Sequence, residues 1–361
     1  MKFPSAKPAD ADPMPSNFAR CSRRAALGAG ALAVGGCFAG AAILHGADGG
    51  GAGRYAGLAT RDYLGELKTE VRVDGKVFTE GPAWDGAGNL FFTNGSQAHI
   101  LRWDVAAKKL SVFREDSNGA NGTVFDAQGR LLVCEAGTKD TGRVTRIEVA
   151  TGKLTVLAEA FDGHLLGAPN DLTVDAKGRI YFTSRLANTD PKLGNVNAVY
   201  RIDPSGRVAR ILASPEIDMP NGVDVSVGSR LLYLIESDGR LNRARSIRTY
   251  DLQADGTVAN MRILHDFYPG RGGDGLCVDV AGNLYVAAGL HKTRGSSETL
   301  DTRPGIHVLS PQGKLVAFLE TPEDTLTNCT FGGADLRTLF ITCGRFLLSC
   351  RTQIAGMRVG G

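Results

Sequence analysis

The chain has few of the features that mark several large classes of protein. Its formal net charge is only +3 over 361 residues, and the basic residues are scattered. A nucleic-acid or acidic-lipid partner is therefore not indicated. The seven cysteines include no CxxC pair, which argues against a zinc or redox motif. Because a Gly-rich phosphate loop and a GxSxG elbow are also missing, nucleotide binding and serine hydrolysis have little support.

Helical periodicity is also missing, and this disfavours an α/β fold. What the chain does contain is glycine, with 47 residues, which indicates many turns and closely approaching backbones. The length suits one large all-β domain or two smaller ones. Cys134, Cys277 and Cys343 fall in apolar runs and are expected to be buried. Cys329 and Cys350 could form a disulfide, although an odd number of cysteines fixes no pairing.

Residues 1–53 are expected to be an export signal and a flexible leader. The stretch "FARCSRRAALGAGALAVGGCFAGAAIL" contains the pair Arg23-Arg24 followed by an uncharged Gly/Ala-rich run, which is typical of a twin-arginine signal. This predicts a periplasmic or secreted protein that meets the membrane only through this segment. The alternatives are a membrane span over residues 25–44 and a lipid anchor at Cys37.

A repeat occupies residues 54–361. An apolar–Asp–x–x–Gly–x–apolar pattern recurs in "PAWDGAGNLFFT", "TVFDAQGRLLVC", "LTVDAKGRIYFT" and "LCVDVAGNLYVA", with looser copies in "VDVSVGSRLLYL" and "TFGGADLRTLFIT". Each copy is typical of a hairpin, and a second hairpin follows it, the last one degraded near "FLLSCRTQIAGMRV". Six four-stranded units at this spacing predict an all-β, six-bladed β-propeller, with residues 65–78 supplying the outer strand that closes the ring. A β-sandwich is the competing all-β fold.

An oxygen-bearing side chain stands just before the first strand of every unit. In a propeller these positions converge at the mouth of the central channel. Two carboxylates and four amides would there repel each other or lack partners, and a divalent cation resolves both problems. The six residues are Glu80, Asn121, Asn170, Asn221, Asp274 and Asn328. Any one of them could instead satisfy only the backbone of its turn, and Asn328 is expected to be structural.

The sequence resembles the SMP-30/gluconolactonase family of six-bladed propeller lactonases. The matching pieces are "TEGPAWD", "APNDLTVDAKGRIYFT", "MPNGVDVS", "GGDGLCVDVAGNLYVA" and "TNCTFGGADLRTLFIT". The resemblance implies that Glu80, Asn170, Asn221 and Asp274 hold or adjoin a catalytic divalent metal. It also implies that Asn121 and Asn170 approach the substrate. An all-oxygen set suits Ca²⁺ first, then Mg²⁺ or Mn²⁺, with Zn²⁺ also acceptable.

The predicted activity is hydrolysis of a small lactone, a sugar-acid lactone or a related ester. The cation would polarise the carbonyl, and Asp274 would position or activate the attacking water. A metal-bound carboxylate is a weak base, so positioning is the better-supported role. The alternatives are a noncatalytic binding propeller with a structural cation and a strictosidine-synthase-like enzyme. Oligomeric state is not indicated by the sequence.

The sequence departs from the family at one position that contacts substrate. In sugar lactonases of this family an arginine stands two places before the Asn-Asp pair, but in this chain that residue is Ala168. Arg271 could supply a replacement cation, or it could be a solvated loop residue. The histidines show no metal-ligand spacing. The loop "HKTRGSSETLDTRPG", residues 291–305, is long for a propeller turn and could be a lid or a surface excursion.

Overall fold

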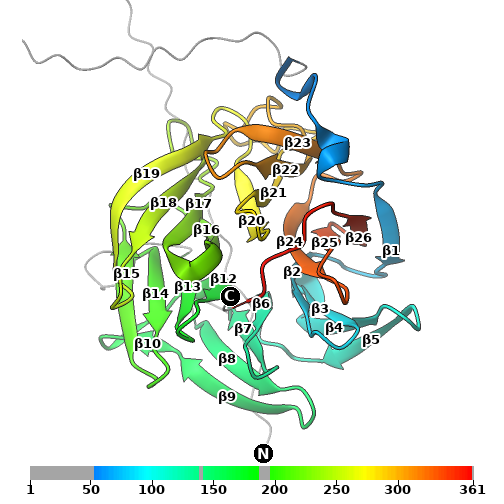
Figure 1. Ribbon diagram of the computed structural model, residues 1–361. Coiled ribbons are helices and arrows are strands. Elements are labelled where there is room, and N and C mark those ends of the chain that lie inside the picture. Colours follow the sequence, from blue (N-terminus) through cyan, green and yellow to red (C-terminus); the bar gives the residue numbers. More distant parts are fainter. Residues whose placement is uncertain (1–52, 138–140, 187–195, 360–361) are drawn as a thin grey trace, which may run out of the picture. The chain divides into compact units, whose positions relative to one another are not determined.

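The computed structural model describes residues 53–137, 141–186 and 196–359. The proposed signal in residues 1–52 therefore lies outside the described residues. Within them, six four-stranded antiparallel sheets form a ring, so the predicted six-bladed propeller is confirmed. Strands β2, β6, β12, β16, β20 and β24 contact one another around the axis and are the innermost strands of their blades (Figure 1). No helix among the described residues has the length and apolarity to cross a membrane.

The first three blades each run from the innermost strand outward in chain order. They comprise β2 (Thr79–Trp84), β3 (Asn89–Asn94), β4 (His99–Asp104) and β5 (Lys109–Arg114); β6 (Ala120–Phe125), β7 (Leu131–Glu135), β8 (Arg143–Glu148) and β9 (Lys153–Ala158); β12 (Ala168–Val174), β13 (Ile180–Arg185), β14 (Ala198–Ile202) and β15 (Val208–Ala213). A small hairpin of β10 (Ala160–Phe161) and β11 (His164–Leu165) stands beside them.

The other three blades also run from the innermost strand outward. They comprise β16 (Pro220–Val225), β17 (Leu231–Glu236), β18 (Ser246–Leu252) and β19 (Val258–Asp266); β20 (Gly273–Val278), β21 (Leu284–Ala288), β22 (Gly305–Leu309) and β23 (Leu315–Glu320); β24 (Leu326–Gly332), β25 (Thr338–Cys343), β26 (Phe346–Arg351) and β1 (Lys68–Arg72). Short 3₁₀ turns lie at Gly53–Tyr55, Thr60–Asp62, Gly95–Gln97 and Val227–Ser229.

Four of the six blades turn where the repeat places its aspartate, and in the fourth blade Ser226 takes that place. Asp126 Oδ1 accepts hydrogen bonds from the backbone N–H groups of Gln128 and Arg130, both at 3.0 Å. Asp279 does the same for Ala281 and Asn283, both at 2.9 Å. A side chain that satisfies two turn donors fixes the connection between the first and second strands. The repeat pattern is therefore the signature of this turn.

The hydrophobic core lies between neighbouring blades. The second strand of a blade, such as β7, is buried on both faces, which explains its continuous apolar run "LLVC". Phe91 of β3 packs edge-on against Phe125 of β6, with ring centroids 5.3 Å apart. Tyr285 and Phe331 make the same contact between the fifth and sixth blades at 4.9 Å. Adjacent sheets thus share an apolar layer, and the polar residues gather at one mouth of the central channel.

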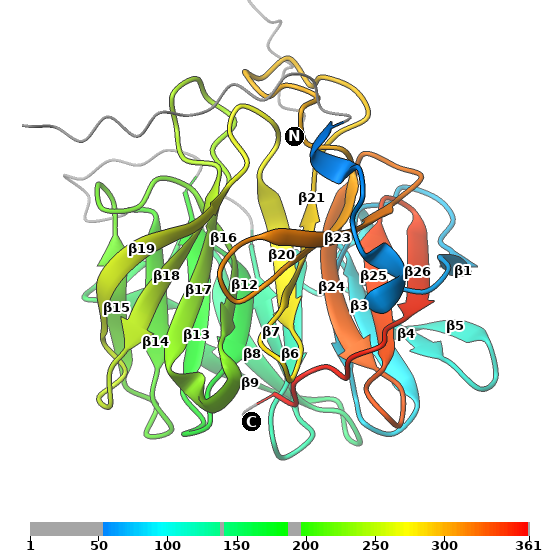
Figure 2. The same cartoon turned by 45° about the horizontal axis from the view of Figure 1, so that its top comes forward.

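The ring closes through β1, which pairs with β26, as predicted for residues 65–78. The expected last hairpin near "FLLSCRTQIAGMRV" is wrong, because only its first half forms a strand. After β26 the chain crosses the end of the channel opposite the long loops (Figure 2), where the Met357 N–H donates to Val278 O at 2.9 Å. Met357 packs there against the apolar layers on both sides of β16. Because β1 from the N-terminal side supplies the outer strand of the last blade, the C-terminal segment is not needed in that sheet and packs across the channel instead.

Candidate functional site

The polar residues predicted to converge occupy equivalent places in the innermost strands. All six strands change register next to the polar residue, as β12 does between Pro169 and Leu172 and β20 between Gly273 and Leu276. Such a bulge re-aims a side chain that would otherwise follow the strand alternation. Glycine follows the polar residue in four blades. A Cβ at Gly222 would stand only 2.6 Å from the carbonyl oxygen of Asp274, so neighbouring inner strands approach closely at this point.

One half of the site gathers two buried carboxylates around an amide. Asn328 Nδ2 lies 3.3 Å from Glu80 Oε2 and 3.3 Å from Asp171 Oδ2. The other oxygen of Asp171 accepts the N–H of Leu172 at 2.9 Å, and Glu80 accepts the N–H of Gly81. Asn328 was expected to be structural, and its amide joins Glu80 to Asp171. Asp171 was not predicted at all.

The other half is a chain of four side chains. Asn221 Nδ2 donates to Asp274 Oδ1 at 2.7 Å, and Asn221 Oδ1 accepts from Arg185 at 2.8 Å. Arg271 donates to Asp274 Oδ2 at 2.6 Å and to Leu326 O at 3.1 Å. Arg271 is therefore a buried partner of Asp274, and the alternative of a solvated loop arginine is wrong. Arg185 was missed by the sequence analysis.

Asn121 and Asn170 complete the ring with amide oxygens that lack a partner. In the described part of the chain, Asn121 Oδ1 and Asn170 Oδ1 are buried and accept no hydrogen bond. A buried oxygen of this kind costs free energy unless a ligand satisfies it. These two side chains are consequently available to a cation, a water or a substrate.

The electrostatics of the centre are dominated by crowded carboxylates. Burial, together with repulsion from Asp171 and Asp274, raises the pKa of Glu80 well above its ordinary value. Burial also raises the pKa of Asp171, and the charges of Asp224 and Asp274 add to this effect. The same three site carboxylates attract Arg185, whose pKa burial lowers. Glu80, Asp171, Asp274 and Arg185 therefore share one electrostatic environment, although no hydrogen bond between described residues joins the two halves directly.

A divalent cation fits this donor set by chemical type. The available atoms are carboxylate and amide oxygens, which suit hard cations, and bound positive charge would relieve the repulsion among the carboxylates. Arg185 uses one lone pair of Asn221 Oδ1 and leaves the second free. Over the described ranges, no three His, Cys, Asp or Glu side chains form a metal cluster on their own. A cation at this site would therefore depend on the amides of Asn170 and Asn221.

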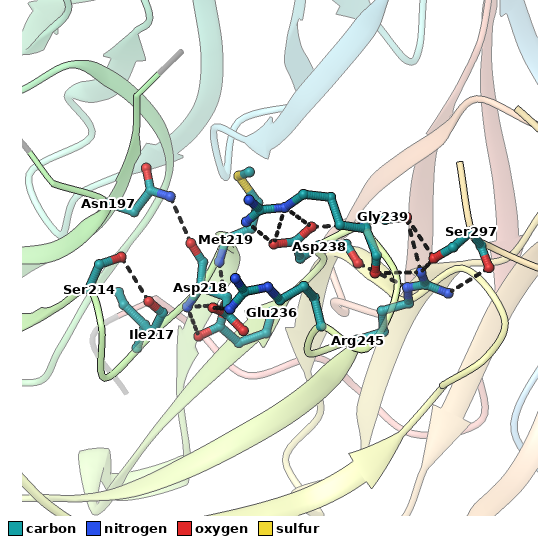
Figure 3. Close-up of polar contacts among 12 residues, drawn as sticks. Asn197, Ser214, Ile217, Asp218, Met219, Glu236, Asp238, Gly239, Arg245 and Ser297 are labelled. Carbon is teal, nitrogen blue, oxygen red and sulfur yellow. Dashed lines mark hydrogen bonds and ion pairs between the residues drawn. The ribbon is translucent and has the colours of Figure 1, made fainter. Parts of the chain in front are cut away.

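Buried ionic groups outside the ring hold the strand entrances in place. Glu236, at the end of β17, accepts the Met219 N–H at 2.7 Å and the Asp218 N–H at 3.1 Å, just before Asn221 (Figure 3). Arg245 likewise holds the backbone just before Asp274, because it donates to Pro269 O at 2.6 Å. These contacts fix the backbone from which Asn221 and Asp274 project.

The long loop over residues 291–305 is tied to the same framework. Arg245 donates to Ser297 Oγ, and the Ser297 N–H donates to Gly239 O at 3.1 Å (Figure 3). His291 Nε2 lies 2.9 Å from Thr321 O. These bonds tie the loop to the framework that carries Asp274.

A cavity of about 410 Å³ occupies the channel between the site and the C-terminal segment. Asp171 and Asn328 line its end nearest the site, and Met357 and Arg358 line the other. Asp224 also lines it, with its Oδ1 accepting the Thr173 hydroxyl at 2.8 Å. Cys329 and Cys350, which could have formed a disulfide, are both free thiols, and Cys329 Sγ lies 3.6 Å from Cys277 Sγ.

Fold and site together define a propeller protein with an oxygen-rich polar centre at one mouth of its channel. Residues 78–345 match the SMP-30/gluconolactonase/LRE-like region, and the chain belongs to this family.

Three relatives illustrate the match. The gluconolactonase of Zymomonas mobilis is 27% identical over 314 residues, covering 80% of this chain and 82% of its own. Regucalcin of Bos taurus is 27% identical over 288 residues, covering 78% and 88%. The solved structure of a gluconolactonase from Xanthomonas campestris superimposes with a TM-score of 0.67 at 29% identity, covering 81% and 91%. Relatives named as gluconolactonases support a lactonase.

Proposed function

We propose that this protein is a divalent-metal-dependent hydrolase of a small lactone, a sugar-acid lactone or a related ester. The observation that carries the proposal is the convergence of Glu80, Asp171 and Asp274 with the unpartnered amide oxygens of Asn121 and Asn170 at one mouth of the channel. The gluconolactonase relatives support the reaction class, and a regucalcin among the relatives supports a cation such as Ca²⁺, with Mg²⁺, Mn²⁺ or Zn²⁺ as alternatives.

Glu80, Asn170, Asn221 and Asp274 would hold the cation. When bound, it supplies the positive charge that polarises a lactone carbonyl. Asp274 is oriented by Asn221 and Arg271, so its carboxylate is fixed in position to hold a water against the carbonyl carbon, to accept a proton from it and to return that proton to the leaving ring oxygen. Asn121 and Asn170 would orient the substrate through their amides. Opening of the ring breaks the acyl C–O bond and yields a hydroxy acid.

The test combines metal analysis with a lactone assay on the purified protein. We expect acid release from glucono-δ-lactone above the spontaneous rate, loss of it on chelation, and recovery when a divalent cation is returned. Asp274→Asn keeps the size of the side chain and removes its charge, and should lower kcat by on the order of 10²- to 10⁴-fold. Asp335→Asn, at an exposed ion pair with Arg351, is the control and should leave activity unchanged.

Two outcomes would reject the enzyme proposal. One is a rate of lactone hydrolysis that changes neither on addition of the chelator nor in Asp274→Asn. The other is a chelator that lowers the thermal midpoint while no lactone is turned over, which would identify a noncatalytic binding propeller with a structural cation.

We also propose that the protein is exported through a twin-arginine signal. The support is the Arg23-Arg24 pair before an uncharged run, in residues that lie outside the described part. Replacing both arginines by lysine should retain the protein in the cytoplasmic fraction. Unchanged fractionation of that variant would contradict the proposal.

A further inference from the structure

A guanidinium stands beside the position at which the sequence lacks one. Ala168 stands where the resemblance noted in the sequence implies an arginine, and the strand register pairs Ala168 directly with Arg185. Directly opposed residues of an antiparallel pair project from the same face, with Cβ atoms about 5 Å apart. Arg185, on the second strand of the blade, therefore brings its positive charge to the region next to Asn170. Because Arg185 lies 17 positions after Ala168 in the chain, a comparison of position 168 alone does not find it.

Arg185 and Arg271 flank the pair formed by Asn221 and Asp274. Arg185 bonds to Asn221 at 2.8 Å on one side, and Arg271 bonds to Asp274 at 2.6 Å on the other. A guanidinium has five N–H donors in a planar fork that matches a carboxylate. Within the described residues, the Arg185 side chain makes a single hydrogen bond, to Asn221, so most of its donors are available to a ligand.

The positive groups at the site also offer partners to an anion. Arg185 and Arg271 would stand beside the proposed divalent cation, facing the carboxylates of Glu80, Asp171 and Asp274. Arg294, on the anchored loop, interacts electrostatically with Arg271 and Asp274, but also with the acidic side chains of Glu298 and Asp324. A substrate carboxylate would accept charge-assisted hydrogen bonds from the donors of Arg185 that Asn221 does not use, whereas a neutral hydroxymethyl group would form weaker ones.

Resting on the proposed function, we propose that Arg185, assisted by Arg271, selects lactones that carry a free carboxylate, such as those of aldaric acids, over neutral aldonolactones. Arg185 is a specificity-determining residue in this proposal: it binds the carboxylate of the substrate that takes no part in ring opening. Arg271 keeps its bond to Asp274 and contributes long-range attraction.

The experiment compares glucaro-γ-lactone with glucono-γ-lactone, which share a ring and differ by a carboxylate in place of a hydroxymethyl group. We expect the native protein to favour the charged lactone in kcat/KM by on the order of 10- to 100-fold, the range of a charge-assisted hydrogen-bonded pair. Arg185→Gln keeps a donor for Asn221 and should abolish most of this preference, chiefly through KM. Arg185→Lys keeps the charge without the fork and should restore part of it.

Arg72→Gln is the matched control, because it removes an arginine at an exposed ion pair on the outer strand β1. It should leave the preference unchanged. If the native protein hydrolyses both lactones equally well, or if Arg185→Gln lowers both by the same factor, Arg185 only positions Asn221 and the inference is overturned.

A binding measurement separates failure of the inference from failure of the proposed function. Tetrahydrofuroate and tetrahydrofurfuryl alcohol form the corresponding pair of cyclic ligands that cannot be hydrolysed. Calorimetric titration of the metal-loaded protein should show tighter binding of the carboxylate, and this difference should be lost in Arg185→Gln. Absence of lactone hydrolysis with the carboxylate preference intact would reject the hydrolase and keep the anion site, whereas equal binding of the two ligands would reject the anion site itself.

Discussion

The ion pair of Arg271 and Asp274 shows how strongly the site depends on single side chains. Both are mostly buried, so neither charge has much water to solvate it, and their 2.6 Å contact is shared with the amide of Asn221. Removing one partner of such a pair typically costs about 3–5 kcal/mol, because the other charge is left uncompensated. A change at either residue therefore alters both the local fold and the reaction, and activity alone cannot separate the two effects.

Asp224 allows a stability prediction away from the reacting groups. Burial raises its pKa from 3.8 to about 6, an effect opposed by hydrogen bonds from the Thr173 hydroxyl and the Val225 N–H. The folded state thus prefers the protonated acid. Its contribution to stability is fully present below about pH 4 and is lost as the pH rises through about 6. Asp224→Asn keeps an oxygen for both donors and should be more stable than the native protein at pH 8 by about 1–3 kcal/mol.

Thermal unfolding at pH 4 and pH 8 checks this prediction. The midpoint of Asp224→Asn should exceed that of the native protein at pH 8 and match it at pH 4. Asp335→Asn provides a control of opposite sign, because the hydrogen bond from Arg351 lowers the pKa of Asp335 to about 2 and stabilises its ionised form. Equal destabilisation by Asp224→Asn at both pH values would show that its charge is satisfied in the folded protein.

At the scale of the element, the bulged start of each inner strand sets the position of the polar side chain that it carries. Gly222 has no functional group, yet a Cβ there would meet Asp274 O at 2.6 Å and the Ile235 side chain at 3.0 Å. Gly222→Ala must therefore push β16 and β20 apart. We expect a loss of about 1–3 kcal/mol in the free energy of unfolding, and a fall in lactonase activity because Asp274 moves with its strand.

Chemical denaturation and the lactone assay measure the two effects of Gly222→Ala. Gly53→Ala is the matched control, since nothing lies within 4 Å of the added Cβ. An alanine at position 222 that leaves both stability and activity at native values would contradict the close packing of the inner strands.

The same element explains what could be predicted from the sequence. Strand alternation, the Asp–x–x–Gly turn and a polar residue at each strand entrance are local patterns that repeat, so the fold and the ring that includes Glu80, Asn221 and Asp274 follow from them. Arg185 and Asp171 could not be found in this way. Arg185 reaches the site only because β13 pairs with β12, and Asp171 is turned inward by the bulge that follows Pro169. Both depend on register and local distortion, which a repeat pattern does not encode.

At the scale of the whole molecule, the ring is held closed by two distant parts of the chain. Strand β1 pairs with β26 from Lys68 opposite Ser349 to Arg72 opposite Phe346. The Gly65 N–H donates to Arg351 O at 2.8 Å, and the Val73 N–H donates to Arg345 O at 2.8 Å, on either side of that ladder. Leu64 is buried in the apolar layer of the last blades. The final blade is therefore complete only when the N-terminal segment has docked.

Removing residues 1–72 should open this closure. A chain that begins at Val73 loses the buried side chain of Leu64, worth about 1.5–3 kcal/mol, and leaves β26 with an unpaired edge. We expect it to unfold at least roughly 5 °C below the native protein and to self-associate through that edge. A chain that begins at Gly53 keeps β1 and should unfold like the full-length protein. Thermal unfolding and size-exclusion chromatography on the two shortened chains decide the matter: equal midpoints and equal elution volumes would show that the last blade is stable with three strands.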